Sequence, residues 1–496
     1  FSSRGLGDVY KRQETIEGSV IHYKTQEEVE SAIMSMCRQR FLLTEDTPLM
    51  NSDGLCQKLG YLGNTSTAEN ILDGRYTVPK NIDKVTKELL HQINEVKRQL
   101  SNKIPSSVSL QDYKQFWRTC KEKTSSSFSG LHFGHYKACA TNDYLASIQA
   151  KSIDLCFRTG IPLRRWSTGL TVMIEKLPGV TLVNKLRAIL LMEADFNFGN
   201  RLIIGKKMVQ GLEKKQFFPP DSFGSRNNLC AIEVPVCRAL FFDVVRQRQY
   251  NAALGSYDAQ SCYDRVVHSF TSMVCQSVGV PQNTIDCMLK AIQKMRYYVR
   301  TAFGDSTTFY DSGEEIFQGL CQGNGAAPAL WLLISSFLLR YLKKKGCSIN
   351  IPSAISGASL SYVALVYVDD GDFPTIAKKP SESIERVTRR HQRTVKYWSK
   401  ALHTSGGALT PSKCFWYPIQ WKWRQGKAYI TEASETKRNI SAPTPEGIMN
   451  NVEKLDSTTA KEVMGVWQTP IGCNKRQIEK MQDQLDAYYV LLDNAY

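Results

Sequence analysis

Apolar positions recur along this chain with two different periods, which predicts both helices and strands. Residues 83–100 show the helical period, because an apolar side chain returns every three or four positions. These apolar positions are Val85, Leu89, Ile93, Val96 and Leu100. Asp83 stands just before them, where a carboxylate can cap the first turn of a helix. We therefore predict a scaffold helix here, and mainly helices between residues 14 and 122.

Four further stretches carry a helical pattern. They are residues 266–278, residues 329–342, residues 387–402 and a C-terminal segment after Asn474. The apolar positions of the last segment are Ile478, Met481, Leu485, Tyr489 and Leu492. The stretch 329–342 is the most apolar of the chain, but it is too short and too interrupted to span a bilayer. We expect it to form a core helix, and we expect no membrane association.

Two regions have the pattern of strands. Residues 173–191 contain two apolar runs around a Pro-Gly turn at 178–179, which predicts a two-stranded ribbon. This ribbon can bring three cations to one end or one face, and they are Lys176, Lys185 and Arg187. Any one of them alone is better explained as a solvated surface charge. The aromatic side chains of residues 415–423 alternate with other residues and predict further strands.

Apolar runs lead into carboxylates at two places. Residues 362–368 are mostly apolar, and the acids that follow are Asp369, Asp370 and Asp372. Residues 252–257 are small or apolar and lead into a lone carboxylate, Asp258. An acid at a strand end often forms part of a turn, so neither place alone indicates chemistry. Together they predict neighbouring strands of one antiparallel sheet that bring their acids to a common edge.

Carboxylates gathered in this way repel one another, at a cost of several kcal/mol in a half-buried cleft. Two Mg²⁺ ions about 4 Å apart can offset that repulsion, because Mg²⁺ takes oxygen ligands and shares them with substrate phosphates. Mn²⁺ can replace Mg²⁺ in such a site. A pair of ions of this kind activates an attacking hydroxyl and stabilises a leaving pyrophosphate, so the acids indicate phosphoryl transfer.

The composition adds a basic charge to this picture. The chain has 496 residues, and its 63 Lys and Arg against 47 Asp and Glu give a net charge of +16. Such an excess favours a nucleic-acid partner, the alternative being a basic surface without a polyanionic partner. The 14 cysteines contain no CxxC pair, which predicts reduced thiols and argues against a disulfide framework or a zinc site. We therefore expect an intracellular protein, in the nucleus or the cytoplasm.

The two acidic motifs resemble those of reverse transcriptases. YVDD, at residues 367–370, is similar to the signature of that family, and SYDAQSCYD, at residues 256–264, is similar to its first palm motif. The resemblance implies that Asp258 and Asp369 bridge the metal ions, with Asp370 beside them. It also implies that Tyr263 is an aromatic steric gate, which excludes a ribose 2′-hydroxyl and favours deoxynucleotides.

Two more motifs resemble the elements of this family that hold the nucleotide. GLCQGNGAAP, at residues 319–328, is similar to the family's glutamine–glycine motif and implies that Gln322 and Gly323 lie beside the incoming nucleotide and the template. The ribbon of residues 173–191 resembles the fingers element whose cations hold the triphosphate. That likeness implies nucleotide binding by Lys176 and Arg187, with Lys185 as an addition.

Two motifs that follow YVDD complete the resemblance, which covers roughly residues 120–470. GALTPSKC, at residues 407–414, implies that Lys413 donates a proton to pyrophosphate. EVMGV, at residues 462–466, resembles the primer grip and implies that Met464 and Gly465 lie near the primer end. The segment between these motifs, residues 415–460, is longer than in compact viral enzymes.

The chain also departs from the family pattern. The glycine–proline–aspartate loop of retrotransposon enzymes is here SSSFSGLHFGHYK, at residues 125–137, similar to serine-rich versions in retrotransposon-like sequences of algae and other protists. In this loop His132 and His135 could ligate a metal, but no third ligand lies near, and backbone or phosphate contacts are favoured. Ala326 and Ala327 precede Pro328, where many relatives have a serine.

The resemblance implies an α+β fold: a right-hand polymerase with fingers, a palm built on an antiparallel sheet and a partial thumb. The expected parts are a helical N-terminal extension (14–122), fingers (123–250), the first part of the palm (251–296), a fingers–palm connection (297–325), the palm with the primer grip (326–473) and the start of a truncated thumb (474–496). Residues 1–13, FSSRGLGDVYKRQ, resemble translated library adaptor, so we expect the true N-terminus to be missing.

The expected function is that of an RNA-directed DNA polymerase, a nucleotidyltransferase of a mobile element, of the non-LTR retrotransposon type. Its expected partners are an RNA template, a DNA primer and dNTPs, and nothing in the sequence indicates an oligomeric state. Two alternatives stay open. One is an inactive polymerase-fold fragment that only binds nucleic acid, and the other is an RNA-directed RNA polymerase, against which Tyr263 argues.

Overall fold

The computed structural model describes residues 12–14, 20–51, 55–100, 103–122, 127–353 and 355–493. The adaptor-like segment 1–13 lies outside the described residues except for Arg12 and Gln13, and so do the last three residues of the expected thumb segment. The chain forms two compact units. The first unit contains residues 1–217, 261–334 and 404–407, and the second contains residues 218–260, 335–403 and 408–496.

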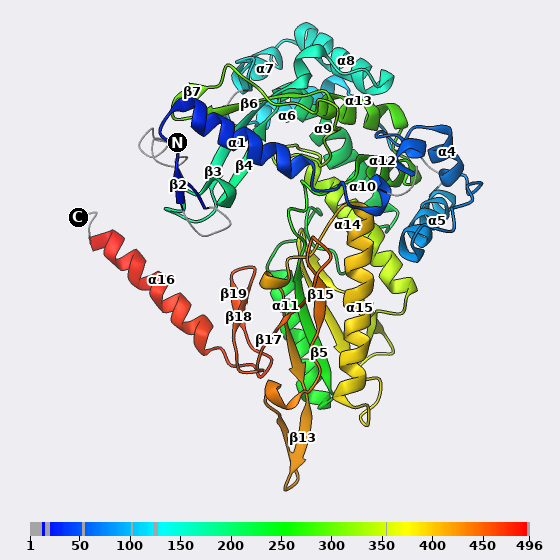
Figure 1. The fold of residues 1–496 in the computed structure, drawn as a ribbon, viewed down its shortest axis with the longest axis vertical. Helices are drawn as coiled ribbons and strands as arrows, with labels where there is room; N and C mark the ends of the chain where they lie inside the picture. The colour runs from blue at the N-terminus through cyan, green and yellow to red at the C-terminus, as the bar shows by residue number, and fades with distance from the viewer. Residues whose placement is uncertain are drawn as a thin grey trace. The chain divides into compact units, whose positions relative to one another are not determined.

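The first unit consists mainly of helices (Figure 1). They are α1 (Gln26–Phe41), α2 (Pro48–Asn51), α3 (Leu55–Leu59), α4 (Ser66–Leu72), α5 (Lys84–Gln99), α6 (Leu110–Thr119), α7 (Phe133–Cys139), α8 (Asp143–Thr159), α9 (Ala194–Asn200), α10 (Val209–Lys214), α12 (His268–Ser277) and α13 (Gln282–Gln293). A short ribbon of β1 (Arg12–Glu14) and β2 (Val20–His22) precedes them.

Helix α5 confirms the prediction for residues 83–100. The Asp83 side chain accepts hydrogen bonds from the backbone N–H groups of Val85 and Thr86, as expected of an N-cap. Four of the predicted apolar positions are buried, and they are Val85, Leu89, Ile93 and Val96. The helical period therefore identified the buried face of this helix correctly.

A four-stranded sheet of order β4-β3-β6-β7 belongs to the same unit. Its strands are β3 (Thr168–Glu175), β4 (Leu186–Leu191), β6 (Arg296–Thr301) and β7 (Gly304–Asp305). β3 runs antiparallel to β4 and parallel to β6. The predicted ribbon is thus confirmed, but its connection extends over residues 176–185 and ends in a 3₁₀ turn at Val183–Lys185, so it is wider than a tight Pro-Gly turn.

The second unit is built on a five-stranded sheet of order β10-β11-β5-β12-β17. These strands are β10 (Leu365–Tyr367), β11 (Asp370–Ile376), β5 (Ala252–Asp258), β12 (Phe415–Ile419) and β17 (Glu453–Lys454). The sheet is antiparallel except for the β12–β17 pair. Helix α11 (Glu233–Arg248) packs on one face, where Phe242 joins a core with Leu254 and Tyr417.

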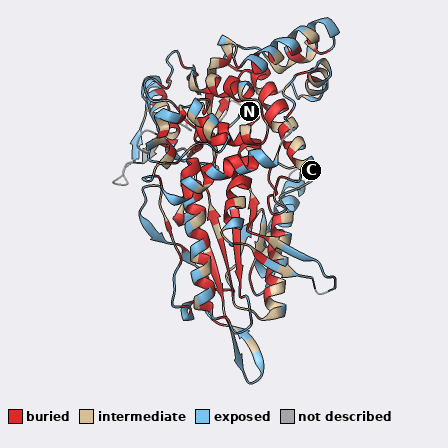
Figure 2. Ribbon diagram, turned by 90° about the vertical axis from the view of Figure 1, so that its right-hand side faces the viewer, coloured by how far each residue is buried: buried red, intermediate tan, exposed pale blue. Residues whose placement is uncertain are grey.

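Helix α15 (Ile384–Ser405) covers the other face of this sheet. His391 hydrogen-bonds to the hydroxyl of Tyr257 on β5, and Trp398 packs against Phe373 on β11. The central strands are therefore buried on both faces (Figure 2). Small residues such as Ala252, Ala253 and Gly255 on β5 let the two helices approach closely.

The remaining elements of the second unit are short hairpins and one terminal helix. The hairpins are β8 (Ile349–Pro352) with β9 (Ser359–Tyr362), β13 (Trp421–Arg424) with β14 (Lys427–Ile430), β15 (Ser441–Pro443) with β16 (Met449–Asn451), and β18 (Lys461–Val463) with β19 (Val466–Gln468). The terminal helix is α16 (Lys475–Asp493).

The other predicted helices are confirmed with small shifts of their ends. Residues 266–278 form α12, residues 329–342 lie within α14 (Ala327–Lys344), and residues 387–402 lie within α15. In α16, however, the predicted apolar positions are exposed, Leu485 by 50% and Ile478 by 64%. No helix in the described part of the chain is both long and apolar enough to cross a membrane.

Candidate active site

The carboxylates of the two acidic motifs meet at one edge of the sheet in the second unit. β5 and β11 are antiparallel neighbours, and their register pairs Asp258 directly with Asp370. Because side chains alternate between the two faces of a strand, Asp258 and Asp370 lie on the same face, and so does Asp372 two residues along β11. This arrangement confirms that the two motifs lie on neighbouring antiparallel strands.

Asp369 lies in the turn that precedes β11, which corrects one detail of the sequence interpretation. The acids do not stand at the end of a single strand, because β10 and β11 form a hairpin in which Val368 and Asp369 connect the strands and Asp370 begins β11. The carbonyl oxygen of Asp369 accepts a hydrogen bond from the N–H of Ala259 at 3.1 Å, just after Asp258. Val368 has a left-handed backbone (φ 57°), a strained conformation for a β-branched residue.

The opposite side of this hairpin is fixed by a close backbone contact. A Cβ at Gly224 would lie 2.8 Å from the nitrogen of Val368, so this position admits only glycine. Nearby, the buried carboxylate of Asp221 accepts hydrogen bonds from the N–H groups of Val363 and Ala364. The turn that carries Asp369 is therefore held by backbone contacts with Ala259 and Gly224, and the Asp221 carboxylate holds the chain just before β10.

Asp372 is neutralised by a residue that the sequence did not reveal. Its carboxylate is 3.1 Å from Nη1 of Arg238 on α11, and both side chains are almost fully buried. The Arg238 guanidinium carbon also lies 5.6 to 5.9 Å from the ring centres of Phe242, Phe415 and Tyr417. In the sequence, Arg238 stands within the mostly apolar stretch 234–245, and a cation at such a position could have indicated a buried acidic partner.

The remaining acids retain an unfavourable accumulation of negative charge. The pKa of Asp370 is raised from 3.8 to about 6, first by desolvation and then by the carboxylates of Asp369, Asp258 and Asp372. The side chain of Asp370 is nevertheless partly exposed at the sheet edge, so it stays accessible to a ligand. The opposing cation is Lys413, whose Nζ lies 3.5 Å from Oδ2 of Asp258 and lowers the pKa of Asp370.

A cavity of about 250 Å³ opens at these acids. Its lining includes Asp258, Asp370 and Lys413 together with Met464, the residue expected in the primer grip. Met464 and Gly465 form the two-residue turn of the β18–β19 hairpin and have positive φ values of 48° and 83°. Such a turn requires the left-handed conformation at both positions, which explains the glycine.

The carboxylates fit a hard divalent cation in donor type and in charge. In the residues that the structure describes, no group of three or more His, Cys, Asp or Glu side chains is arranged to hold a metal ion. Mg²⁺ needs no such cage, because it commonly binds through one or two carboxylates and completes its shell with water and substrate phosphates. The paired Asp258 and Asp370, with Asp369 adjacent, supply oxygen donors and an excess of negative charge.

The cations predicted to hold a triphosphate lie in the first unit. Lys176 directly follows β3, Lys185 ends the 3₁₀ turn, and Arg187 lies on β4 opposite Ile174. All three lie at the end of the β3–β4 ribbon where residues 176–185 connect the two strands. Arg187 is exposed, and Lys176 contributes a favourable charge to the buried carboxylate of Asp264.

The glutamine–glycine motif packs against this same ribbon. The carbonyl of Gln322 accepts a hydrogen bond of 2.7 Å from the N–H of Leu190 on β4. Gly323 has φ +112°, and a Cβ there would lie 2.2 Å from the Leu190 carbonyl oxygen, so glycine is required. The N–H of Leu320 also donates to the carbonyl of Tyr263 at 2.6 Å. The motif thus connects Tyr263 with the ribbon.

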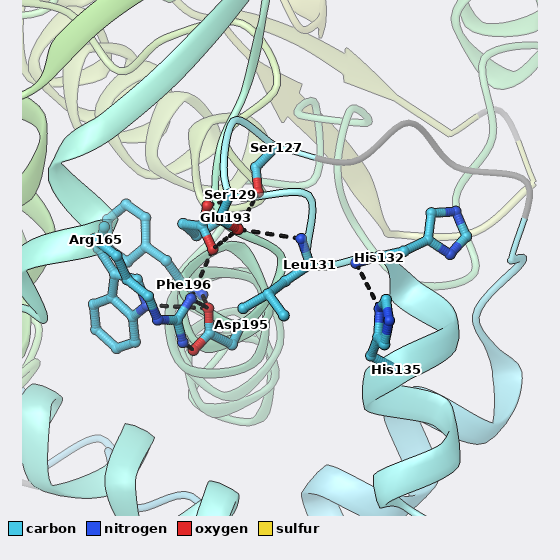
Figure 3. Close-up of polar contacts among 10 residues, drawn as sticks. Ser127, Ser129, Leu131, His132, His135, Arg165, Glu193, Asp195 and Phe196 are labelled. Carbon is cyan, nitrogen blue, oxygen red and sulfur yellow. Dashed lines mark hydrogen bonds and ion pairs between the residues drawn. The ribbon is translucent and has the colours of Figure 1, made fainter.

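The two histidines of the serine-rich loop accept backbone hydrogen bonds at the start of a helix, and Figure 3 shows the one between His132 and His135. Nδ1 of His132 accepts from the N–H of Gly134, and Nδ1 of His135 accepts from the N–H of His132. These are backbone contacts at the start of α7, which agrees with the favoured sequence interpretation.

The predicted site residues thus fall into two groups. One group, in the second unit, comprises Asp258, Asp369, Asp370, Lys413, Met464 and Gly465. The other, in the first unit, comprises Lys176, Lys185, Arg187, Tyr263, Gln322 and Gly323. Within each group the structure brings together segments that are far apart in the sequence.

Comparison with known proteins gives one family match. The family described as reverse transcriptase (RNA-dependent DNA polymerase) matches residues 176–430, just over half of the 496 residues. The matched range includes both acidic motifs, the β3–β4 cations after residue 175 and Lys413. A comparison with curated proteins found no match.

Proposed function

The chain belongs to the reverse transcriptase family, and from this premise we propose that it extends a DNA primer on an RNA template by a mechanism that uses two divalent metal ions. The observation that carries this proposal is the register of β5 and β11, which pairs Asp258 with Asp370 on one face of the sheet. The same edge holds Asp369 in a turn fixed by hydrogen bonds, and it opens into a cavity.

The proposed reaction is attack of the primer 3′-hydroxyl on the α-phosphorus of a dNTP. A new P–O bond forms to the primer, the bond to the β-phosphate bridging oxygen breaks, and pyrophosphate leaves. Asp258, Asp369 and Asp370 would hold Mg²⁺ or Mn²⁺, which when bound supplies charge neutralisation for this transfer. Lys413, beside Asp258, is the proposed proton donor to the leaving pyrophosphate.

The other predicted residues have proposed roles in binding. The cations Lys176, Lys185 and Arg187 hold the triphosphate, and Gln322 and Gly323 position the nucleotide and the template. Tyr263 excludes ribonucleotides, which disfavours an RNA-directed RNA polymerase. Met464 and Gly465 hold the primer end, and the contribution of Met464 to the cavity at the carboxylates supports this role.

We further propose a biological setting. The basic charge and the serine-rich loop support a mobile element of the non-LTR type, similar to elements in algae and protists, that acts in the nucleus or the cytoplasm. In this proposal the segments 123–250 and 297–325 serve as fingers and their connection, 251–296 and 326–473 form the palm, and 474–496 begins a thumb.

Primer extension tests the proposal. With a labelled DNA primer on an RNA template, dNTPs and Mg²⁺, the wild-type chain should extend the primer, and Asp369→Asn should reduce the rate on the order of 10³-fold, because loss of several kcal/mol of charge stabilisation has that effect. Asp483→Asn, at an exposed position of α16, is the matched control and should extend normally.

Two results would contradict the proposal. Full activity of Asp369→Asn would exclude the carboxylate mechanism. Salt-sensitive binding of primer–template without extension in either Mg²⁺ or Mn²⁺ would instead favour the binding-only alternative.

A further inference from the structure

A second basic site lies in the first unit, at the end of β3 opposite to Lys176. A cavity of about 870 Å³ opens there beside Thr168, the first residue of β3. Five cations line it, and among the described residues no acid does: Arg164, Arg165, Lys290, Lys294 and Arg296. Lys176 follows the last residue of this eight-residue strand, about 25 Å away at the usual rise per residue. The cavity is therefore separate from the triphosphate cations.

Three of the five cations keep their charge available for a ligand. Of these five, two form ion pairs with acids within the described part of the chain: Arg165 pairs with Glu193 and Asp195, and Lys290 pairs with Asp286. The other three, Arg164, Lys294 and Arg296, are all exposed. An uncompensated cluster of this kind attracts phosphate groups.

An exposed aromatic surface continues from this cavity. The Arg296 guanidinium carbon lies 5.0 Å from the ring centre of Phe309. The ring centres of Phe309 and Tyr298 are 5.6 Å apart, and Tyr298 stacks on Phe128 with ring centres 4.2 Å apart. Phe128 is 43% exposed and Phe309 is 39% exposed. On β6, Arg296 and Tyr298 point to the same face because the strand alternates, with Tyr297 buried between them.

The position of Phe128 is fixed by a buried carboxylate. The residues on both sides of it, Ser127 and Ser129, donate hydrogen bonds of 2.7 and 2.9 Å to Glu193, which is fully buried (Figure 3). Glu193 also accepts from Arg165 of the cavity wall at 2.7 Å. One carboxylate therefore fixes both the loop that presents the aromatic ring and one wall of the basic cavity. The serine-rich loop thereby gains a role as the support of an exposed ring.

We propose that Arg164, Lys294 and Arg296, together with Phe128, Tyr298 and Phe309, form an accessory site for single-stranded nucleic acid. Unpaired cations bind the phosphates, and exposed rings stack on bases, which are accessible only in a single strand. The site goes beyond the proposed reaction, because it needs neither the carboxylates nor a metal ion.

Fluorescence anisotropy with a 5′-labelled single-stranded RNA of about 20 nucleotides, in EDTA and without dNTPs, tests this site. Arg164→Gln/Lys294→Gln/Arg296→Gln should weaken binding at least about tenfold. It should also make the negative slope of log affinity against log salt less steep by about 2, since each phosphate contact contributes about −0.7. Arg38→Gln/Arg75→Gln/Lys97→Gln removes the same charge elsewhere in this unit and should change affinity less than about threefold.

The aromatic part has its own pair of variants. Phe128→Ala should weaken RNA binding by about fivefold or more without changing the salt slope, because it removes stacking and no charge. Tyr144→Ala, at a 75% exposed position of α8, is the control and should have no effect. Circular dichroism checks that each variant is folded.

Crosslinking to the wild-type chain tests the same site without any variant. RNA that carries 4-thiouridine should crosslink to peptides containing Phe128, Tyr298 or Phe309. Crosslinks confined to other regions would overturn the proposal, and so would equal RNA affinity of the two triple variants. Displacement of the RNA by equimolar tripolyphosphate, or equal binding of anionic lipid vesicles, would assign the surface to another ligand and overturn it too. Because no metal or dNTP is present, an inert catalytic centre would not alter these results.

Discussion

At the residue scale, Arg238 explains why the buried carboxylate of Asp372 is tolerated so close to Asp370. Asp372 is 3% exposed and pairs with Arg238, which is fully buried. A buried carboxylate without a partner is strongly destabilising, because desolvation of its charge is not compensated. Arg238 thus stabilises the strand that begins with Asp370 and allows two acids to remain directed at the sheet edge.

The Arg238–Asp372 pair leads to a stability prediction. Arg238→Met should lower the free energy of unfolding by about 3–5 kcal/mol in urea, because it leaves Asp372 buried and unpaired. The double variant Arg238→Met/Asp372→Asn should recover much of that loss. Lys422→Met breaks an exposed pair with Glu435 and should cost less than about 1 kcal/mol. An Arg238→Met variant as stable as the wild type would show that the pair has no such role.

Asp264, next to Tyr263, gives a prediction about pH. Burial raises the pKa of Asp264 from 3.8 to about 6, although Arg40 and Lys176 partly oppose this rise. In the unfolded chain the carboxyl loses its proton near pH 4, whereas the folded chain holds it to about pH 6. The contribution of this group to stability is therefore complete below pH 4 and is lost as the pH rises to about 6.

Comparison of the wild type with Asp264→Asn isolates this effect, since the amide does not titrate. The stability of the wild type relative to the variant should fall between pH 4 and pH 6 by up to about 3 kcal/mol and should then stay constant. Denaturant unfolding at several pH values measures the difference. A stability difference between wild type and Asp264→Asn that does not change with pH would contradict the raised pKa of the buried Asp264 carboxyl.

At the element scale, the β18–β19 hairpin connects fold and function. Its turn uses positive φ at Met464 and Gly465, and Met464 lines the cavity at the carboxylates. A Cβ at Gly465 would meet no neighbouring atom, so only the backbone conformation demands glycine. Loss of the turn would therefore act on the proposed primer grip without disturbing the core.

Gly465→Ala tests this element. The left-handed conformation costs a residue with a Cβ about 1–2 kcal/mol, so the affinity for primer–template should fall roughly 5- to 30-fold. The KM for dNTP should change little. Gly357→Ala, at an exposed glycine with open space around it, is the control. An unchanged primer affinity, with a folded protein, would remove Met464 and Gly465 from the primer grip.

The elements also show what the sequence could and could not predict. Helix α5 followed from periodicity because its buried face repeats regularly, and the pair β3–β4 followed from two apolar runs around a Pro-Gly turn. The hairpin of β10 and β11 did not, because β11 begins within the acidic residues themselves and the turn uses a left-handed valine in place of glycine. Arg238 escaped prediction because its partner is 134 positions away and only the folded sheet brings them together.

At the scale of the whole molecule, the functional residues come from segments that local patterns do not relate. The second unit assembles residues 218–260, 335–403 and 408–496, and the proposed metal ligands come from the first two of these segments. The net charge of +16 and the family motifs could be read from the sequence, and both indicate a nucleic-acid partner. The pairing of Asp258 with Asp370 required the fold, since it depends on the strand register.

The central claim is that Asp258, Asp369 and Asp370 together bind divalent metal ions for nucleotidyl transfer. The most direct test is Mn²⁺ binding, followed by the electron paramagnetic resonance signal of free Mn²⁺, with an RNA template, a dideoxy-terminated primer and the next dNTP. Asp258→Asn/Asp370→Asn should weaken Mn²⁺ binding by at least about tenfold, the smallest effect typical of a disturbed metal site, whereas Asp483→Asn should bind as the wild type does. Equal Mn²⁺ binding by the wild type and the double variant would contradict the account.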